Sequence, residues 1–345
     1  SHSMTPEGLT DSWLSTVLDA DVRVLGTSRI GDGLVGMNIR LELESDGSVP
    51  TSLIAKLPSP DPTSRATGIA LRNYEREVYF YLELAPTVDI RVARCHHAEW
   101  EFATGDFVVL MEDLTPARQG NQLTGCDADQ ARIAVLELAK LHGPRWGDPT
   151  LADIEWLSRR GESDGHQLGA LWAMFLPGFF NTYNRYLSAE ARAVIERFGQ
   201  AIVGWANHRD PPNTVTHGDY RLDNLMFGTA EGGPPIAAVD WQTPGHGLGI
   251  TDVSYFMGAG VVPEERRRLE RNLVDEYGQA LADYGVAVDG DEMWRQYRRE
   301  AYAGVIMAVI ASQLVGSNER SEAMFAAMAT RHAQHVLDLD SESLL

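Results

Sequence analysis

The sequence predicts an α+β protein of two lobes, in which a strand-rich first part precedes a mainly helical second part. Its 345 residues, 44% of them hydrophobic, suffice for two lobes with a sizeable core. Short aliphatic and β-branched runs, with one helix among them, fill roughly residues 20–110. Apolar residues then recur at helical spacing in 129–142 and 189–208, and Pro263 opens a long helix with acids in its first turn.

The boundary between the lobes follows an apolar run that ends abruptly in two acids. We place the first lobe at residues 4–111, a connecting segment at 112–120 and the helical lobe at 121–345. Neither an internal repeat nor a low-complexity linker interrupts this division. The most apolar stretch, residues 301–315, is too short to span a bilayer and contains Ser312, so we expect a buried helix there.

The most informative stretch is His-Gly-Asp-Tyr-Arg-Leu-Asp-Asn at 217–224, followed by Val-Asp-Trp at 239–241. In this pattern Asp219 can accept a hydroxyl proton, while Asn224 and Asp240 can offer oxygen ligands to Mg²⁺. Phosphoryl transfer needs these groups, because the metal must be held while a separate carboxylate orients the nucleophile. The sequence therefore predicts a metal-assisted phosphoryl-transfer site.

A hairpin is expected to bring these groups together. Residues 222–227 should form a short strand, and a turn at 230–235 should lead into a second strand at 236–239. This arrangement would deliver Asp240 beside Asn224.

With these motifs the chain resembles the aminoglycoside phosphotransferase and choline kinase family, small-molecule kinases with a protein-kinase-like fold. The resemblance implies a two-lobed protein-kinase-like fold with the nucleotide in the first lobe and the catalytic loop and acceptor site in the second. It implies that Asp219 is the catalytic base and that Asn224 and Asp240 bind Mg²⁺. We further expect Arg221 to offset the charge that develops on the transferred group, and Asp252 to anchor the loop to backbone amides.

Lys56 belongs to the expected nucleotide site. The chain has 29 Lys and Arg residues, yet only Lys56 and Lys140 are lysines, so a lysine within an apolar run is unusual. Its compact ammonium group suits contact with α- and β-phosphate oxygens, and an exposed place on an edge strand is the alternative. The resemblance favours Glu77 as its carboxylate partner, with Glu75 as the alternative.

A glycine-rich turn at residues 30–36 stands about one strand ahead of Lys56. Gly31 and Gly33 would let backbone amides approach phosphate, and Leu34 would cover the base. Glycine-bearing hairpins are common, so this turn gains its meaning from its position.

The strand at 107–114 resembles the hinge of the same family. The resemblance implies that Met111, Glu112 and Leu114 present backbone groups or apolar surface to the adenine ring. An ordinary core strand would have the same pattern.

The expected reaction is the transfer of the γ-phosphoryl group of ATP, or of GTP, to a hydroxyl group of a small molecule. The acceptor could be aminoglycoside-like or another hydroxylated metabolite, because the aromatic segment 172–180 resembles the ecdysteroid-kinase-like subgroup. Trp172 and Phe179 would line the acceptor pocket or, alternatively, belong to the core.

Two other functions fit the pattern less well. A catalytically idle nucleotide-binding module would have lost a catalytic group, and none of the expected ones is missing. A protein kinase usually has His-Arg-Asp where this chain has His-Gly-Asp, and it would carry Ala-Pro-Glu after Asp240.

Composition limits the partners. A net charge of −20 argues against nucleic acid and could favour a cationic acceptor, although solubility and genome composition produce the same balance. Cys95 and Cys126 form no Cys-x-x-Cys pair and therefore predict neither zinc nor a disulfide framework, as in a reduced cytoplasmic setting. No signal peptide or membrane span is expected, and Ser-His-Ser before Met4 has the character of an expression scar. The oligomeric state is left open.

Overall fold

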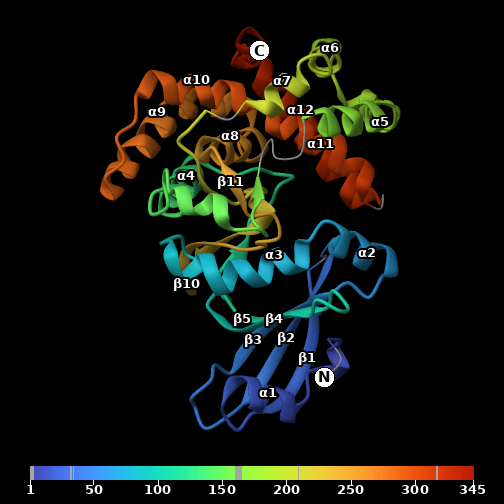
Figure 1. The fold of residues 1–345 in the computed structure, drawn as a ribbon, viewed down its shortest axis with the longest axis vertical. Coiled ribbons are helices and arrows are strands. Elements are labelled where there is room, and N and C mark those ends of the chain that lie inside the picture. Colours follow the sequence, from blue (N-terminus) through green and yellow to red (C-terminus); the bar gives the residue numbers. More distant parts are fainter. Residues whose placement is uncertain (1–3, 32, 34, 160–164, 209, 316–317) are drawn as a thin grey trace. The chain divides into compact units, whose positions relative to one another are not determined.

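The computed structural model describes residues 4–31, 33, 35–159, 165–208, 210–315 and 318–345 (Figure 1). The predicted α+β class is confirmed, since strands dominate the first part of the chain and helices the second. The chain divides into two compact units. The first holds the residues up to Thr87, Arg91–Arg118 and Gly228–Pro244, and the second holds Val88–Ile90, Gln119–Phe227 and Gly245–Leu345.

An antiparallel sheet with strand order β1-β2-β3-β5-β4 forms the centre of the first unit. Its strands are β1 (Arg23–Ile30), β2 (Gly36–Glu44), β3 (Ser52–Pro58), β4 (Cys95–Trp100) and β5 (Phe107–Glu112). Lys56 lies on the middle strand β3, opposite Asn38 of β2 and Val109 of β5. The alternative of an exposed edge-strand lysine is therefore wrong.

The alternation of side chains along β3 decides which face Lys56 occupies. Leu53, Ala55 and Leu57 are fully buried in the apolar cluster that also contains Leu14 of helix α1 (Asp11–Leu18). Because successive side chains of a strand point to opposite faces, Lys56 points away from that cluster.

Two short helices of the first unit follow β3. Helix α2 (Pro62–Ala70) begins with Pro62, and the side chain of Asp61 accepts a hydrogen bond from the Ser64 amide. Helix α3 (Asn73–Tyr79) continues into a π-helical turn at Phe80–Leu84.

The second unit is mainly helical, as predicted. Its longer helices are α4 (Ala128–His142), α5 (Gly165–Tyr183), α6 (Ala189–Phe198), α7 (Ile202–Asn207), α8 (Gly249–Gly260), α9 (Pro263–Leu281), α10 (Gly290–Glu300), α11 (Tyr302–Leu314) and α12 (Glu319–Asp338). The helices expected at 129–142 and from Pro263 are confirmed as α4 and α9. The helix expected at 189–208 is broken at Gly199, where a Cβ would lie 3.2 Å from Nε1 of Trp172.

Short strands frame the segment that contains the predicted catalytic loop. They are β6 (Arg118–Gln119), β7 (Ser158–Arg159), β8 (Thr214–Thr216), β9 (Leu225–Thr229), β10 (Gly232–Ala238) and β11 (Gly245–Gly247). The strand predicted at 222–227 begins only at Leu225, because Leu222–Asn224 form a 3₁₀ turn. The following turn is shorter than predicted, since Gly232 and Gly233 have positive φ and already belong to β10.

The apolar segment near residue 310 forms helix α11, whose buried apolar side chains are Tyr302, Val305, Ala308, Val309 and Ile310. Within the part of the chain that the structure describes, we find no helix with the length and apolarity that a membrane crossing needs.

The aromatic residues of α5 are divided between core and surface. Trp172 and Phe179 are 2% and 0% exposed, and they pack against Phe198 and Tyr183 respectively. Both rings are therefore core side chains, which is the alternative to a place in an acceptor pocket. Phe180 is less buried, and the guanidinium group of Arg192 lies 4.5 Å from its ring centre.

The replacement Phe179→Ala should lower the free energy of unfolding by about 3–5 kcal/mol, because it empties a fully buried ring site. Chemical denaturation measures this loss. Met174→Ala on the same helix is the control, since Met174 is 66% exposed and its truncation should change stability little. Equal stability of the two variants would contradict the core assignment.

Candidate active site

A buried lysine and two carboxylates form the polar centre of the first unit. The ammonium nitrogen of Lys56 lies 2.8 Å from Glu77 Oε1 and 2.7 Å from Asp240 Oδ1. Glu77 comes from α3 and Asp240 from the segment that follows β10. Glu75, the alternative partner, instead pairs with Arg72 at 2.8 Å.

Burial makes this ion cluster electrostatically strong. Lys56 is 5% exposed and Glu77 1%. Burial alone would lower the pKa of Lys56, but the negative charges of Asp240 and Glu77 outweigh it and raise the pKa above its ordinary value. Lys56 is thus a permanent positive charge. Burial also raises the pKa of Glu77, which Lys56 opposes and Asp240 reinforces.

The backbone next to Asp240 fixes the direction of its carboxylate. Asp240 has a φ of 64°, a conformation that non-glycine residues rarely adopt outside sites where the surroundings enforce it. The neighbouring Trp241 supplies that enforcement, because its amide donates to Glu77 Oε2 at 3.0 Å and its ring stacks on Phe80 at 3.9 Å. The Asp240 side chain remains 38% exposed.

The glycine-rich turn leaves little room around Lys56. Gly31 has a φ of 66°, and a Cβ on Gly33 would overlap the carbonyl oxygen of Gly36. A Cβ on Gly36 would lie 3.3 Å from Cε of Lys56, so the absence of a side chain lets β2 start against the lysine. Leu34 lies outside the described residues.

Contacts of Glu112 fix the expected hinge within the first unit. Met111 and Leu114 are both 7% exposed. Glu112 accepts two hydrogen bonds from the Arg91 guanidinium at 2.8 and 2.9 Å, and its amide donates to the Arg94 carbonyl at 2.8 Å. The hydrogen bond with Arg91 is the main cause that lowers the pKa of Glu112. The Glu112 amide is thus engaged within the unit.

The predicted catalytic loop lies in the second unit, where three side chains surround Asp219. The hydroxyl group of Tyr255 donates to Asp219 Oδ1 at 2.6 Å, and Arg221 Nε lies 3.3 Å from the same oxygen. Asn224 Nδ2 donates to Oδ2 at 3.1 Å and to the backbone carbonyl of Asp219 at 2.8 Å. Because the amide nitrogen faces Asp219, Oδ1 of Asn224 is the atom that could bind a metal.

Asp252 of α8 holds the start of this loop. Its carboxylate accepts hydrogen bonds from the amides of His217 and Gly218 at 2.9 and 3.1 Å, and its Oδ2 lies 2.8 Å from Nε2 of His142. The expectation that Asp252 anchors the loop to backbone amides is confirmed. His217 also supports the loop, since the amide of Asp219 donates to its Nδ1 at 3.1 Å.

The Arg221 side chain is largely buried. It is 9% exposed, and Nη1 lies 3.1 and 3.5 Å from the sulfur atoms of Met324 and Met328 on α12. The structure places its guanidinium group against the Asp219 carboxylate, so its nearest electrostatic effect falls on that group.

The sequence analysis did not identify Tyr255, Trp241 or Gly36 as site residues. A signal for Tyr255 was present, because it follows Asp252 by three residues and both therefore share one face of α8. Trp241 was noted only for its place beside Asp240, and its packing on Phe80 depends on tertiary structure.

Comparison with known proteins gives a family match. Residues 38–287 match the family model described as the phosphotransferase enzyme family. The search of curated protein sequences found no match.

Solved structures resemble the chain over nearly its whole length. The GDP complex of wild-type aminoglycoside 2'-phosphotransferase-IIIa has 13% identity and a TM-score of 0.56, covering 97% of this chain and 98% of that one. Choline kinase from Cryptosporidium parvum Iowa II has 10% identity and a TM-score of 0.57, covering 92% and 90%. A choline kinase from Streptococcus pneumoniae has 12% identity and a TM-score of 0.51, covering 97% and 99%. At such low identity these likenesses establish the fold.

The replacement Asp252→Ala should destabilise the second unit by about 2–4 kcal/mol, because the buried amide of His217 and the amide of Gly218 lose their acceptor. Urea denaturation measures the change. Asp275→Ala on helix α9 is the control, since Asp275 is exposed and its loss should cost little. A stable Asp252→Ala variant would show that the loop does not depend on this carboxylate.

Proposed function

Since this chain belongs to the phosphotransferase enzyme family, we propose that it transfers the γ-phosphoryl group of ATP or GTP to a hydroxyl group of a small molecule. The observation that carries this proposal is the charge on Lys56, which is held in the first unit between Glu77 and Asp240. Burying an ammonium group is costly, and two carboxylates fix this one in a single place. Such a fixed point charge suits the oxygens of a nucleotide phosphate.

The first unit supplies the nucleotide contacts. Lys56 binds the α- and β-phosphates, and Glu77 orients it. The turn with Gly31 and Gly33 approaches the phosphates through backbone amides, and the same turn includes Leu34. The hinge residues Met111 and Leu114 face the base, whereas Glu112 fixes the hinge through Arg91 and does not offer its engaged amide.

Asn224 and Asp240 are the proposed ligands of Mg²⁺. Their donor atoms fit this ion, because Mg²⁺ prefers oxygen, and Asn224 directs its amide nitrogen to Asp219 while Asp240 is partly exposed. No group of three or more His, Cys, Asp or Glu residues in the described chain could hold a metal ion, so the ion would need nucleotide phosphates and water as further ligands. When bound, Mg²⁺ would neutralise charge on the phosphates.

Asp219 is the proposed base. It accepts the proton of the acceptor hydroxyl group while the new bond from oxygen to phosphorus forms and the bond to the leaving nucleoside diphosphate breaks. Arg221 stabilises the negative charge of Asp219 from 3.3 Å before the proton arrives.

The proposed acceptor is an aminoglycoside-like compound or another hydroxylated metabolite. The names of the similar structures mention an aminoglycoside phosphotransferase and choline kinases, and one of these structures is a GDP complex, which keeps GTP as an alternative donor. A net charge of −20 would favour a cationic acceptor among these compounds.

Mg²⁺-ATP at millimolar concentration should raise the melting temperature of the protein, because it binds the native state. Lys56→Ala should weaken this shift. Lys140→Ala is a matched control, since its side chain is 53% exposed and the replacement should leave the shift unchanged. An equal shift in both variants would remove Lys56 from the nucleotide site. If neither ATP nor GTP produced a shift in the unaltered protein, the whole proposal would fail.

A nucleotide-consumption screen over aminoglycosides, macrolides, choline-like amines, sugars and sterols should find an acceptor that is phosphorylated by the native protein. Asp219→Asn should lower kcat at least 100-fold and keep the thermal shift with Mg²⁺-ATP, because only the base is lost. Asp240→Asn should lose both turnover and metal-dependent binding. Equal loss of nucleotide affinity in the two variants would contradict the roles assigned, and binding without turnover across the screen would favour an idle module.

A further inference from the structure

Tyr255 makes the shortest of the hydrogen bonds to the proposed base that the structure describes. Its hydroxyl group donates to Asp219 Oδ1 at 2.6 Å, and its side chain is almost fully buried in the second unit. Short hydrogen bonds from O–H groups to carboxylates are among the stronger ones in proteins. Tyr255 and Asp252 lie three residues apart on α8, so one helix face holds both the backbone and the side chain of the catalytic loop.

The remaining contacts of Asp219 distinguish its two oxygens. Oδ1 accepts the hydrogen bond from Tyr255 and faces Arg221 Nε at 3.3 Å. Oδ2 accepts a longer hydrogen bond, at 3.1 Å, from Asn224. Each carboxylate oxygen can accept two hydrogen bonds, so Oδ2 keeps more capacity to accept a proton.

The ring of Tyr255 packs against helix α12. His332 stacks on it with 5.4 Å between ring centres and an angle of 26°. His332 is fully buried, and a Cβ at Gly258 or Gly304 would clash with its imidazole, so two glycines make room for it. This packing fixes where the hydroxyl group of Tyr255 points.

We propose that Tyr255 is a positioning residue of the phosphoryl transfer, which fixes Oδ1 of Asp219, stabilises the charged carboxylate and directs Oδ2 to the acceptor hydroxyl group. This inference rests on the proposed function, and it deepens it by assigning the proton to one oxygen of the base.

The charged groups around Tyr255 allow it to act as a donor throughout the pH range of an enzyme assay. Burial first, and then the charge of Asp219, raises the pKa of Tyr255 well above its ordinary value, whereas Arg221 opposes this and Asp223 adds to it. On the side of α12, burial lowers the pKa of His332 well below its ordinary value, so that ring is neutral.

Asp252 also lies on α8, and it accepts hydrogen bonds from the backbone of the same loop. Because Tyr255 is a neutral donor, removing its hydroxyl group should act on Asp219 without altering the charge of any neighbour.

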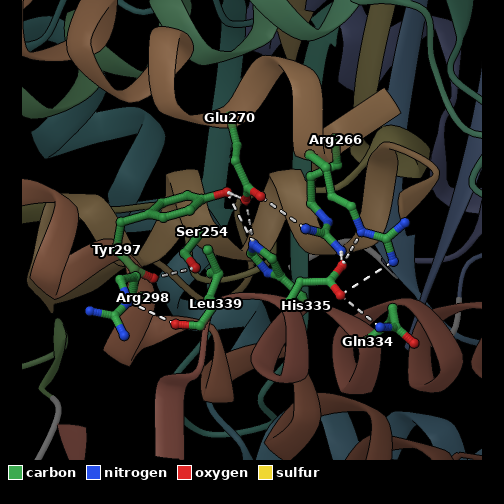
Figure 2. Close-up of polar contacts among 10 residues, drawn as sticks. Ser254, Arg266, Glu270, Tyr297, Arg298, Gln334, His335 and Leu339 are labelled. Atoms are coloured by element: carbon green, nitrogen blue, oxygen red, sulfur yellow. Dashed lines mark hydrogen bonds and ion pairs between the residues drawn. The ribbon is translucent and has the colours of Figure 1, made fainter. Parts of the chain in front are cut away.

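A second tyrosine in the same unit provides a matched control. The hydroxyl group of Tyr297 donates to Glu270 Oε1 at 2.6 Å (Figure 2), and its ring is fully buried. Nε2 of His335 lies 3.0 Å from the same carboxylate oxygen, and Arg266 Nη1 donates to Glu270 Oε2 at 2.9 Å. Tyr297→Phe thus deletes the same kind of buried hydrogen bond from tyrosine to carboxylate, but away from Asp219.

The experiment compares Tyr255→Phe with Tyr297→Phe in the full chain, with the acceptor found by the screen and with water as the acceptor in nucleotide hydrolysis. Tyr255→Phe should lower kcat about tenfold, the effect of losing a charge-assisted hydrogen bond, with unchanged KM for the nucleotide. The KM for the acceptor should stay within about twofold of the native value, because the proposal places Tyr255 on the base and not on the acceptor. Tyr297→Phe should leave kcat unchanged.

Replacing Tyr255 by 3-fluorotyrosine keeps the shape of the ring and so tests the inference even if Tyr255→Phe folds poorly. Its hydroxyl group still donates to Asp219, so kcat should return to within about twofold of the native value. A native kcat in Tyr255→Phe, or a loss of kcat with 3-fluorotyrosine equal to that in Tyr255→Phe, would overturn the inference and leave the proposed function standing. A native protein that neither transfers nor hydrolyses nucleotide would overturn both.

Discussion

The constraint on which the first unit depends is the burial of one positive charge on the central strand of its sheet. An unpaired ammonium group at 5% exposure would be strongly destabilising, so the surrounding elements must bring carboxylates to it. Helix α3 provides Glu77. The segment after β10 provides Asp240, which follows Lys56 by 184 residues in the sequence. The rare backbone conformation of Asp240 and the stacking of Trp241 on Phe80 follow from this requirement, because they hold the second carboxylate in place.

In the second unit the corresponding constraint is to hold the Asp219 carboxylate, the proposed base, in a fixed position. Helix α8 provides the residues that hold it. The Asp252 carboxylate accepts hydrogen bonds from the amides of His217 and Gly218. One helical turn later, the hydroxyl group of Tyr255 donates to the side chain of Asp219. The helix is itself fixed by a polar contact with α10, since Ser254 donates to the Tyr297 carbonyl at 2.9 Å. Three consecutive loop residues are therefore held by one helix face, which limits the freedom of the proposed base.

The sequence was most informative where chemistry depends on residue type and short spacing. The α+β class, the family resemblance and the helices α4 and α9 followed from local patterns. It was least informative where tertiary packing decides. The resemblance favoured Glu77 as the partner of Lys56 but left Glu75 open, and the fold decides between them. The helix expected at 189–208 is interrupted between Phe198 and Ile202, where Gly199 packs against Trp172. The contact between Tyr255 and Asp219 joins residues 36 positions apart, so the spacing of Tyr255 from Asp252 indicates a shared helix face but not the contact itself.

The charge balance of the two clusters gives a physical reason for the different roles proposed for Asp240 and Asp219. In the first cluster one ammonium group faces two carboxylates, so that ionised Glu77 and Asp240 leave one negative charge in excess. Asp240 is the more exposed of the two carboxylates, so it is the one that a divalent cation could reach. In the second cluster Asp219 faces the guanidinium group of Arg221, which offsets its charge, and its remaining neighbours are neutral donors. A carboxylate that is balanced in this way would compete poorly for a metal ion, while its Oδ2 would remain available to accept a proton, as the proposed role of a base requires.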